Sequence, residues 1–198
     1  METRRGFLKK TLGGAALLAA AGAVPLALRK TQLREARSPL RFFTVEEYSI
    51  FAAVAERVLA RGPLDLPPDL AATAQRRPLP PSAAELDVAG RADAFLAPLD
   101  AASAKELKQL LVLFDNALFS FVTGGPPRPF TRMTPDEQDA HLVRWATSRM
   151  AVRRTGFQAL KRLTAAVYYS SPLTYAAVGY PGPPYELVRT VNASRGRR

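Results

Sequence analysis

The side chains that could carry out chemistry in this sequence are few and do not form a catalytic set. The single histidine, His141, could act as a general base or as a haem ligand. It has no cysteine partner and no obvious carboxylate to orient it, and such a histidine is more often a helix-surface or interface residue. Asp115 lies in an apolar stretch, where we expect it to pair with an arginine such as Arg149 or Arg153. A pair of this kind is structural more often than catalytic, so we expect no catalytic residue in this chain.

Sequence motifs for cofactors and metals are absent as well. The 198 residues contain no cysteine, which excludes a zinc thiolate site, an iron–sulfur cluster, a thiol-attached haem, a cysteine nucleophile and a disulfide. No glycine-rich dinucleotide or phosphate motif occurs, nor does a serine-hydrolase or zinc-protease motif. With 47% hydrophobic and 23% charged residues, the composition is that of a globular protein. The sequence predicts a folded chain that holds no cofactor and no metal of its own.

The net charge of +11 is concentrated at the two ends of the chain. Residues 1–41 hold nine basic and two acidic residues, and residues 189–198 hold four arginines and no acid. Residues 42–188 hold 15 residues of each sign. Because a nucleic-acid-binding fold carries its positive patch on the folded surface, this distribution argues against a nucleic-acid partner. We expect the arginine-rich end to be a solvated tail, which could touch anionic lipid or an acidic partner.

The first residues match a twin-arginine export signal. The consensus residues, all present in order, are Arg4, Arg5, Phe7, Leu8 and Lys9. A weakly apolar run covers residues 11–28, and basic residues follow it, which is the order of a targeting segment. A plain basic tail is the alternative interpretation. We expect passage through the twin-arginine translocase to the periplasm and association with the bacterial inner membrane, with the signal either cut near Ala21 or kept as an anchor.

Apolar residues recur at helical spacing through the middle of the chain, and no long stretch alternates with the period of a strand. The sequence predicts an all-α bundle of about five helices with proline-rich connecting loops, preceded by the signal segment. The expected helices cover about residues 44–61, 84–99, 103–122, 134–150 and 154–169, and a proline-rich loop covers residues 62–82. The expected organisation is a signal, apolar segment and basic linker in 1–41, a helical domain in 42–188 and a basic tail in 189–198.

Capping patterns indicate where several of these helices begin. Thr44 with Glu47 forms a potential capping box, and Ser103 begins a second one. Thr134 followed by Pro135 is a strong helix start, with a capping side chain and a proline in the first turn. Because the helix expected after Ser103 is apolar on most sides, we predict that it lies at the centre of the bundle.

Five tyrosines fall within residues 168–185, with prolines and glycines between them. Tyrosine and proline present large, stiff and partly polar surface at a low entropic cost, which suits a protein interface. A loop whose tyrosines simply cover the bundle is equally compatible with these residues. The residues that we expect at a partner interface are Tyr168, Tyr169, Tyr175, Tyr180, Pro181, Gly182, Pro183 and Tyr185.

Together these features resemble the gluconate 2-dehydrogenase subunit 3 family, which supplies the small subunits of membrane-bound gluconate 2-dehydrogenases and of bacterial FAD-dependent glucose dehydrogenases. The resemblance covers most of residues 3–184, apart from the proline-rich loop. It is carried by the export signal, the Phe-Thr-x-x-Glu sequence ending at Glu47, the long apolar stretch, and Asp87 and Asp93, which stand one residue further apart than in the family pattern. Its sharpest pieces are Tyr168-Tyr169 and Gly179-Tyr180-Pro181-Gly182-Pro183-Pro184.

The resemblance implies a role in a complex. A flavoprotein of the glucose–methanol–choline (GMC) type would carry FAD and oxidise a sugar or alcohol. The small subunit would bind that flavoprotein, support its maturation and carry it through the twin-arginine pore, and a multihaem cytochrome c would take the electrons. The family's small subunit contributes no catalytic residue. Two other interpretations stay open at this point: a free-standing exported helical binding protein, and an enzyme that uses His141 or Asp115.

Overall fold

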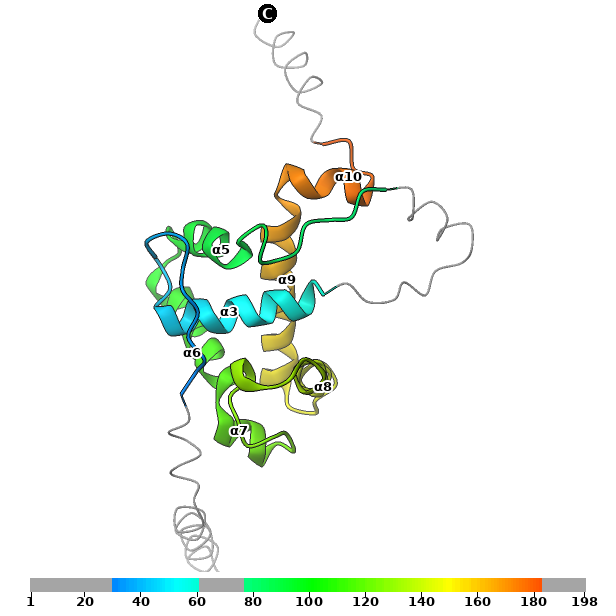
Figure 1. The fold of residues 1–198 in the computed structure, drawn as a ribbon. Coiled ribbons are helices and arrows are strands. Elements are labelled where there is room, and N and C mark those ends of the chain that lie inside the picture. Colours follow the sequence, from blue (N-terminus) through cyan, green and yellow to red (C-terminus); the bar gives the residue numbers. More distant parts are fainter. Residues whose placement is uncertain (1–29, 61–76, 183–198) are drawn as a thin grey trace, which may run out of the picture.

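The computed structural model describes residues 30–60 and 77–182, and within these ranges the chain forms helices and no strand (Figure 1). The all-α prediction is therefore confirmed. No helix in these ranges is both long enough and apolar enough to cross a membrane. The predicted site residues that lie outside the described ranges are Arg4, Arg5, Phe7, Leu8, Lys9, Pro183 and Tyr185.

Helix α3, Val45–Val58, is the centre of the fold and packs against four other helices (Figure 1). The predicted capping box is confirmed. The backbone N–H of Glu47 donates to Thr44 Oγ1 at 3.2 Å, and the backbone N–H of Thr44 donates to the Glu47 carboxylate at 2.8 Å. Phe51 in the middle of α3 is fully buried. The prediction that the stretch 103–122 lies at the centre of the bundle was therefore wrong. The central helix is α3, which is surrounded by other helices.

Helix α5, Val88–Leu96, begins later than the sequence predicted. A tight turn over residues 82–87 comes first, in which the backbone N–H of Ser82 donates to the Glu85 carboxylate at 2.6 Å and the N–H of Glu85 donates to Ser82 Oγ at 3.1 Å. The turn ends at Asp87, whose backbone is left-handed with φ of 47°. Its carboxylate accepts from the backbone N–H of Gly90 at 3.1 Å, so the helix starts only after Asp87.

The apolar stretch that was predicted as one helix forms two, α6 (Ala101–Asp115) and α7 (Ala117–Val122). Asp100, and not Ser103, caps α6, because its Oδ1 accepts from the backbone N–H groups of residues 102 and 103, each at 3.0 Å. Asn116 separates the two helices: its backbone is extended, and its side chain accepts from the N–H of Phe119 at 2.8 Å. The buried residues of α6 are Leu111, Phe114 and Asp115.

Helices α8 and α9 and a short C-terminal helix complete the bundle. Helix α8, Pro135–Ala146, begins at the predicted Thr134 cap, and helix α9, Ala151–Tyr169, follows it. Short 3-10 turns cover Phe130–Arg132 (η2) and Pro172–Thr174 (η3), and helix α10 covers Tyr175–Val178. Gly156 lets α9 approach its neighbours closely, because a Cβ at this position would lie 2.5 Å from Leu110 and 3.0 Å from Trp145.

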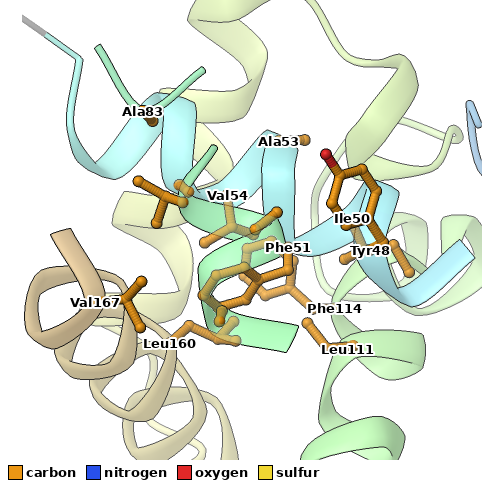
Figure 2. Close-up of a cluster of buried hydrophobic side chains, with 14 of the residues drawn as sticks. Tyr48, Ile50, Phe51, Ala53, Val54, Ala83, Leu111, Phe114, Leu160 and Val167 are labelled. Carbon is orange, nitrogen blue, oxygen red and sulfur yellow. The ribbon is translucent and has the colours of Figure 1, made fainter. Parts of the chain in front are cut away.

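The hydrophobic core forms around α3. Figure 2 shows Phe51 on α3 with Leu160 and Val167 of α9 on one side and Leu111 and Phe114 of α6 on the other. Full burial of an aliphatic or aromatic side chain of this size contributes roughly 1.5–3 kcal/mol to folding. The core therefore packs α3, α6 and α9 together.

Candidate functional site

His141 lies inside the core and not on the helix surface where it was predicted. It is 1% exposed, and its ring contacts those of Phe114, Phe130 and Trp145 at centroid distances of 4.9, 5.4 and 5.9 Å. Within the described residues neither ring nitrogen forms a hydrogen bond of normal geometry. Burial, reinforced by nearby arginines, lowers the pKa of His141 to about 3. A neutral ring enclosed by aromatic side chains cannot reach a substrate, so His141 is a structural residue.

Asp115 also has a structural role, but its partners are not the predicted arginines. Its carboxylate accepts from Thr31 Oγ1 at 2.7 Å and from the backbone N–H of Thr131 at 2.8 Å. Burial raises the pKa of Asp115, and these hydrogen bonds oppose that increase. Asp115 therefore ties the segment before α3 and the η2 turn to the end of α6. A cavity of about 510 Å³ borders it, but both carboxylate oxygens are already engaged.

The two acids that carry the family resemblance, Asp87 before α5 and Asp93 on it, hold the backbone in place. Asp87 caps α5 and accepts from the Tyr48 hydroxyl at 3.1 Å. Burial and the nearby Asp87 carboxylate raise the pKa of Tyr48 to about 12.

Asp93 is 3% exposed and accepts three backbone N–H bonds, from residues 41, 42 and 43, at 2.7–2.9 Å. Across the described part of the chain, no group of three or more potential ligands could hold a metal ion.

The predicted interface tyrosines do not all lie at the surface. Tyr168 is 5% exposed and packs in the core, where its hydroxyl donates to the backbone carbonyl of Pro81 at 2.6 Å. Tyr169 is 48% exposed, and its ring meets that of Tyr168 edge-to-face at 5.0 Å. Tyr168 therefore supports Tyr169 from beneath and is not itself available to a partner at the surface of this chain.

Tyr175 and Tyr180 form a second aromatic pair beyond α9. Their rings meet edge-to-face at 4.9 Å, and the backbone N–H of Tyr180 donates to the carbonyl of Tyr175 at 2.9 Å. The turn between them needs Gly179, whose φ is 70° and whose absent Cβ leaves room for the Arg77 guanidinium. Pro181 and Gly182 follow at the end of the described chain, and Tyr180 is 44% exposed.

Sequence reasoning missed the aliphatic residues that accompany these tyrosines. Leu173 is 67% exposed on η3, Val178 is 44% exposed on α10, and Leu79 is 77% exposed on the segment that runs beside α10 (Figure 1). We call this surface the tyrosine-rich end, and it consists of Leu79, Tyr169, Leu173, Val178 and Tyr180. Leu173 follows a proline within the tyrosine-rich stretch, which was the available signal in the sequence. Leu79 belongs to a segment that only the fold brings to α10, where the Arg77 guanidinium lies against Gly179. An exposed group of this kind is typical of a protein interaction surface.

Comparison with known proteins gives one match. A family model described as "Gluconate 2-dehydrogenase subunit 3" matches residues 45–182. The matched stretch begins with the first residue of α3 and ends at the last described residue, so it contains the whole helical body and the tyrosine-rich end. Neither a curated protein nor a solved structure matches the chain.

Proposed function

The chain belongs to the gluconate 2-dehydrogenase subunit 3 family, and from this membership we propose that it is the non-catalytic small subunit of a flavin-dependent dehydrogenase complex. The observation that carries the proposal is the tyrosine-rich end, where aromatic and aliphatic side chains are exposed. The buried acids and the histidine support a non-catalytic role, because each is used in packing or in holding the backbone.

The proposed partner is a GMC-type flavoprotein that carries FAD and oxidises a sugar or alcohol. The small subunit binds this flavoprotein, supports its maturation, escorts it through the twin-arginine translocase and stays in the complex at the periplasmic side of the inner membrane. A multihaem cytochrome c receives the electrons. The consensus residues from Thr3 to Lys9 support the export step, and the family match supports the association with dehydrogenase subunits.

Co-purification tests this function directly. The full chain, with a carboxy-terminal tag, is expressed in its own host and recovered from the periplasm and membrane, and the visible spectrum of the recovered material is recorded. We expect a yellow flavin spectrum together with a large partner band. Tyr180→Ala should reduce the flavin recovered, because a central aromatic anchor contributes roughly 2 kcal/mol or more to binding. Phe95→Ala is the matched control, since Phe95 is an aromatic residue 64% exposed on α5, outside the tyrosine-rich end.

Three results would oppose the proposal in different ways. A colourless single band would make the chain a free-standing exported binding protein. Oxidation of a sugar by the purified chain alone, with a dye as acceptor, would contradict the non-catalytic role. Equal flavin recovery with the Tyr180→Ala and Phe95→Ala variants would leave the complex in place but would remove the tyrosine-rich end as its contact surface.

A further inference from the structure

A buried arginine with no ion-pair partner among the described residues lies where α7, α8 and α9 meet. Arg153 is 6% exposed, and within the described residues its Nε and Nη2 have no hydrogen-bond partner. Its guanidinium carbon lies 5.5 Å from the ring centre of Trp145 and 6.0 Å from that of Phe119. Cation–π contacts of this kind offset only part of the cost of burying a charge. Burial and the neighbouring Arg144 together lower the pKa of Arg153.

Two further polar groups in the same place are also unsatisfied. Arg144 Nη2 and Ser120 Oγ are both buried without a hydrogen-bond partner among the described residues. They converge on Gly125, where a Cβ would lie 3.1 Å from Arg144 Nη2 and 2.4 Å from Ser120 Oγ. Arg144 as a whole is half-buried, so part of this residue lies at the surface. We call the group of Ser120, Arg144 and Arg153 the arginine cluster.

The sequence stretch that contains Arg144 and Arg153 has no acidic residue. From residue 140 to residue 185 the sequence contains six lysines and arginines and no aspartate or glutamate. Helix α9 begins with no acidic residue in its first turn and no side-chain cap, so the positive end of its dipole is not neutralised there. His141, which also faces this region from α8, is neutral and supplies no negative charge. The chain thus concentrates positive charge at a point where burial makes it costly.

Exposed apolar side chains are present on the same three elements. They are Phe121 and Val122 on α7, Val143 on α8, and Met150 and Val152 around the start of α9, each 45–64% exposed. Figure 1 shows that α7, α8 and this end of α9 lie at the opposite end of the molecule from α10. Arginine set among exposed apolar residues is the composition enriched at protein interfaces, and the guanidinium fork matches a carboxylate in two parallel hydrogen bonds.

We propose that the arginine cluster receives an aspartate or glutamate side chain of the dehydrogenase subunit, and that α7, α8 and the start of α9 form a second docking surface for it. This inference rests on the proposed function. The partner's carboxylate supplies the negative charge and the hydrogen-bond acceptors that the described chain does not offer at this point. The exposed apolar residues on the same three elements would be covered by the partner together with the pair, and exclusion of water strengthens such a pair.

The test combines the stability of the free chain with the assembly of the complex. Arg153→Met and Arg144→Met each remove one charge and keep an unbranched side chain, and Arg162→Met is the matched control, because Arg162 is exposed on α9. The melting temperature of each purified full-length variant is measured, and the flavoprotein captured by each tagged variant is quantified at low and high salt. We expect Arg153→Met to melt at or above the wild-type temperature, because it removes a buried charge that has no ion pair among the described residues. We expect it to weaken capture by about 30-fold or more, whereas Arg162→Met changes capture by less than about threefold.

The outcomes separate this inference from the function on which it rests. If the wild-type chain captures no flavoprotein, the proposed function fails and the inference fails with it. If the wild type captures the flavoprotein and both arginine variants capture it equally well, only the second docking surface is refuted. If Arg153→Met melts well below the wild type and binds normally, the arginine is a structural residue. If acetate raises the melting temperature of the wild-type chain and the variants still assemble, the cluster binds a free anion and not the partner.

Discussion

Replacement of Asp93 by asparagine should measure how strongly the segment before α3 is held to the bundle. Asp93 Oδ1 accepts from the backbone N–H groups of Phe42 and Phe43 at 2.9 and 2.7 Å, and Oδ2 accepts from that of Arg41 at 2.8 Å. Asparagine keeps one acceptor oxygen, so two of the bonds survive without the negative charge. The amide NH2 group of asparagine is a donor and cannot accept a hydrogen bond from the third backbone N–H, which is left unsatisfied.

The expected loss can be built from these contacts. An unsatisfied buried donor costs about 1–3 kcal/mol, and a neutral acceptor forms a bond roughly half as strong as a charged one. Asp93→Asn should therefore lower the free energy of unfolding by about 2–4 kcal/mol at neutral pH, as measured by urea denaturation followed by circular dichroism. Asp100→Asn is the control, because asparagine caps a helix as well as aspartate and Asp100 is exposed at the start of α6.

The pH dependence gives the same prediction an independent check. The three backbone N–H bonds lower the pKa of Asp93 despite its burial. A carboxylate with a lowered pKa in the folded state contributes stability that is present above its unfolded pKa of about 3.9 and is lost as pH falls through the folded value. The difference between wild type and Asp93→Asn should therefore shrink below about pH 4. A difference of less than about 0.5 kcal/mol at pH 7, or one that stays constant down to pH 2, would refute this account of the anchor.

Two other substitutions test the packing around α8 and α9. Because the pKa of His141 is lowered to about 3, the unfolded chain binds more protons between pH 3 and 6.5, and stability should fall by about 2 kcal/mol from pH 6.5 to pH 5. His141→Leu should remove that fall in urea denaturation at the two pH values, and an unchanged slope would contradict the buried neutral ring. Gly156→Ala should lower the free energy of unfolding by about 1–3 kcal/mol through overpacking against Leu110 and Trp145. A gain in stability, as expected for an open helical position, would show that α9 has room to move.

Capping patterns in the sequence correctly predicted where two of the helices begin. The capping pairs at Thr44 and Thr134 place the starts of α3 and α8 correctly, because a capping box is formed within four residues. The pattern at Ser103 failed because Asp100, three residues earlier, caps the same helix first. The break at Asn116 was missed, although an asparagine that can cap a new helix was a visible signal.

The arrangement of the helices was harder to predict, because apolar content does not say which neighbours cover a helix. The stretch 103–122 looked central, yet part of its apolar surface stays exposed, including Val112 and Phe121. The burial of His141 could have been deduced, since Gln138, Leu142 and Trp145 share its buried face at helical spacing. The arginine cluster could not have been deduced, because it depends on three helices meeting in space.

Helix α9 fixes the distance between the two surfaces proposed for the partner. Arg153 lies in its first turn and Tyr169 is its last residue, and these two residues are about 24 Å apart along the helix axis. Two contacts at the two ends of one helix reinforce each other. When one contact opens, the other keeps the partner close, so the open contact forms again at a high effective concentration. For the proposed complex, this means that the partner subunit has to match the spacing along α9 to benefit from both contacts.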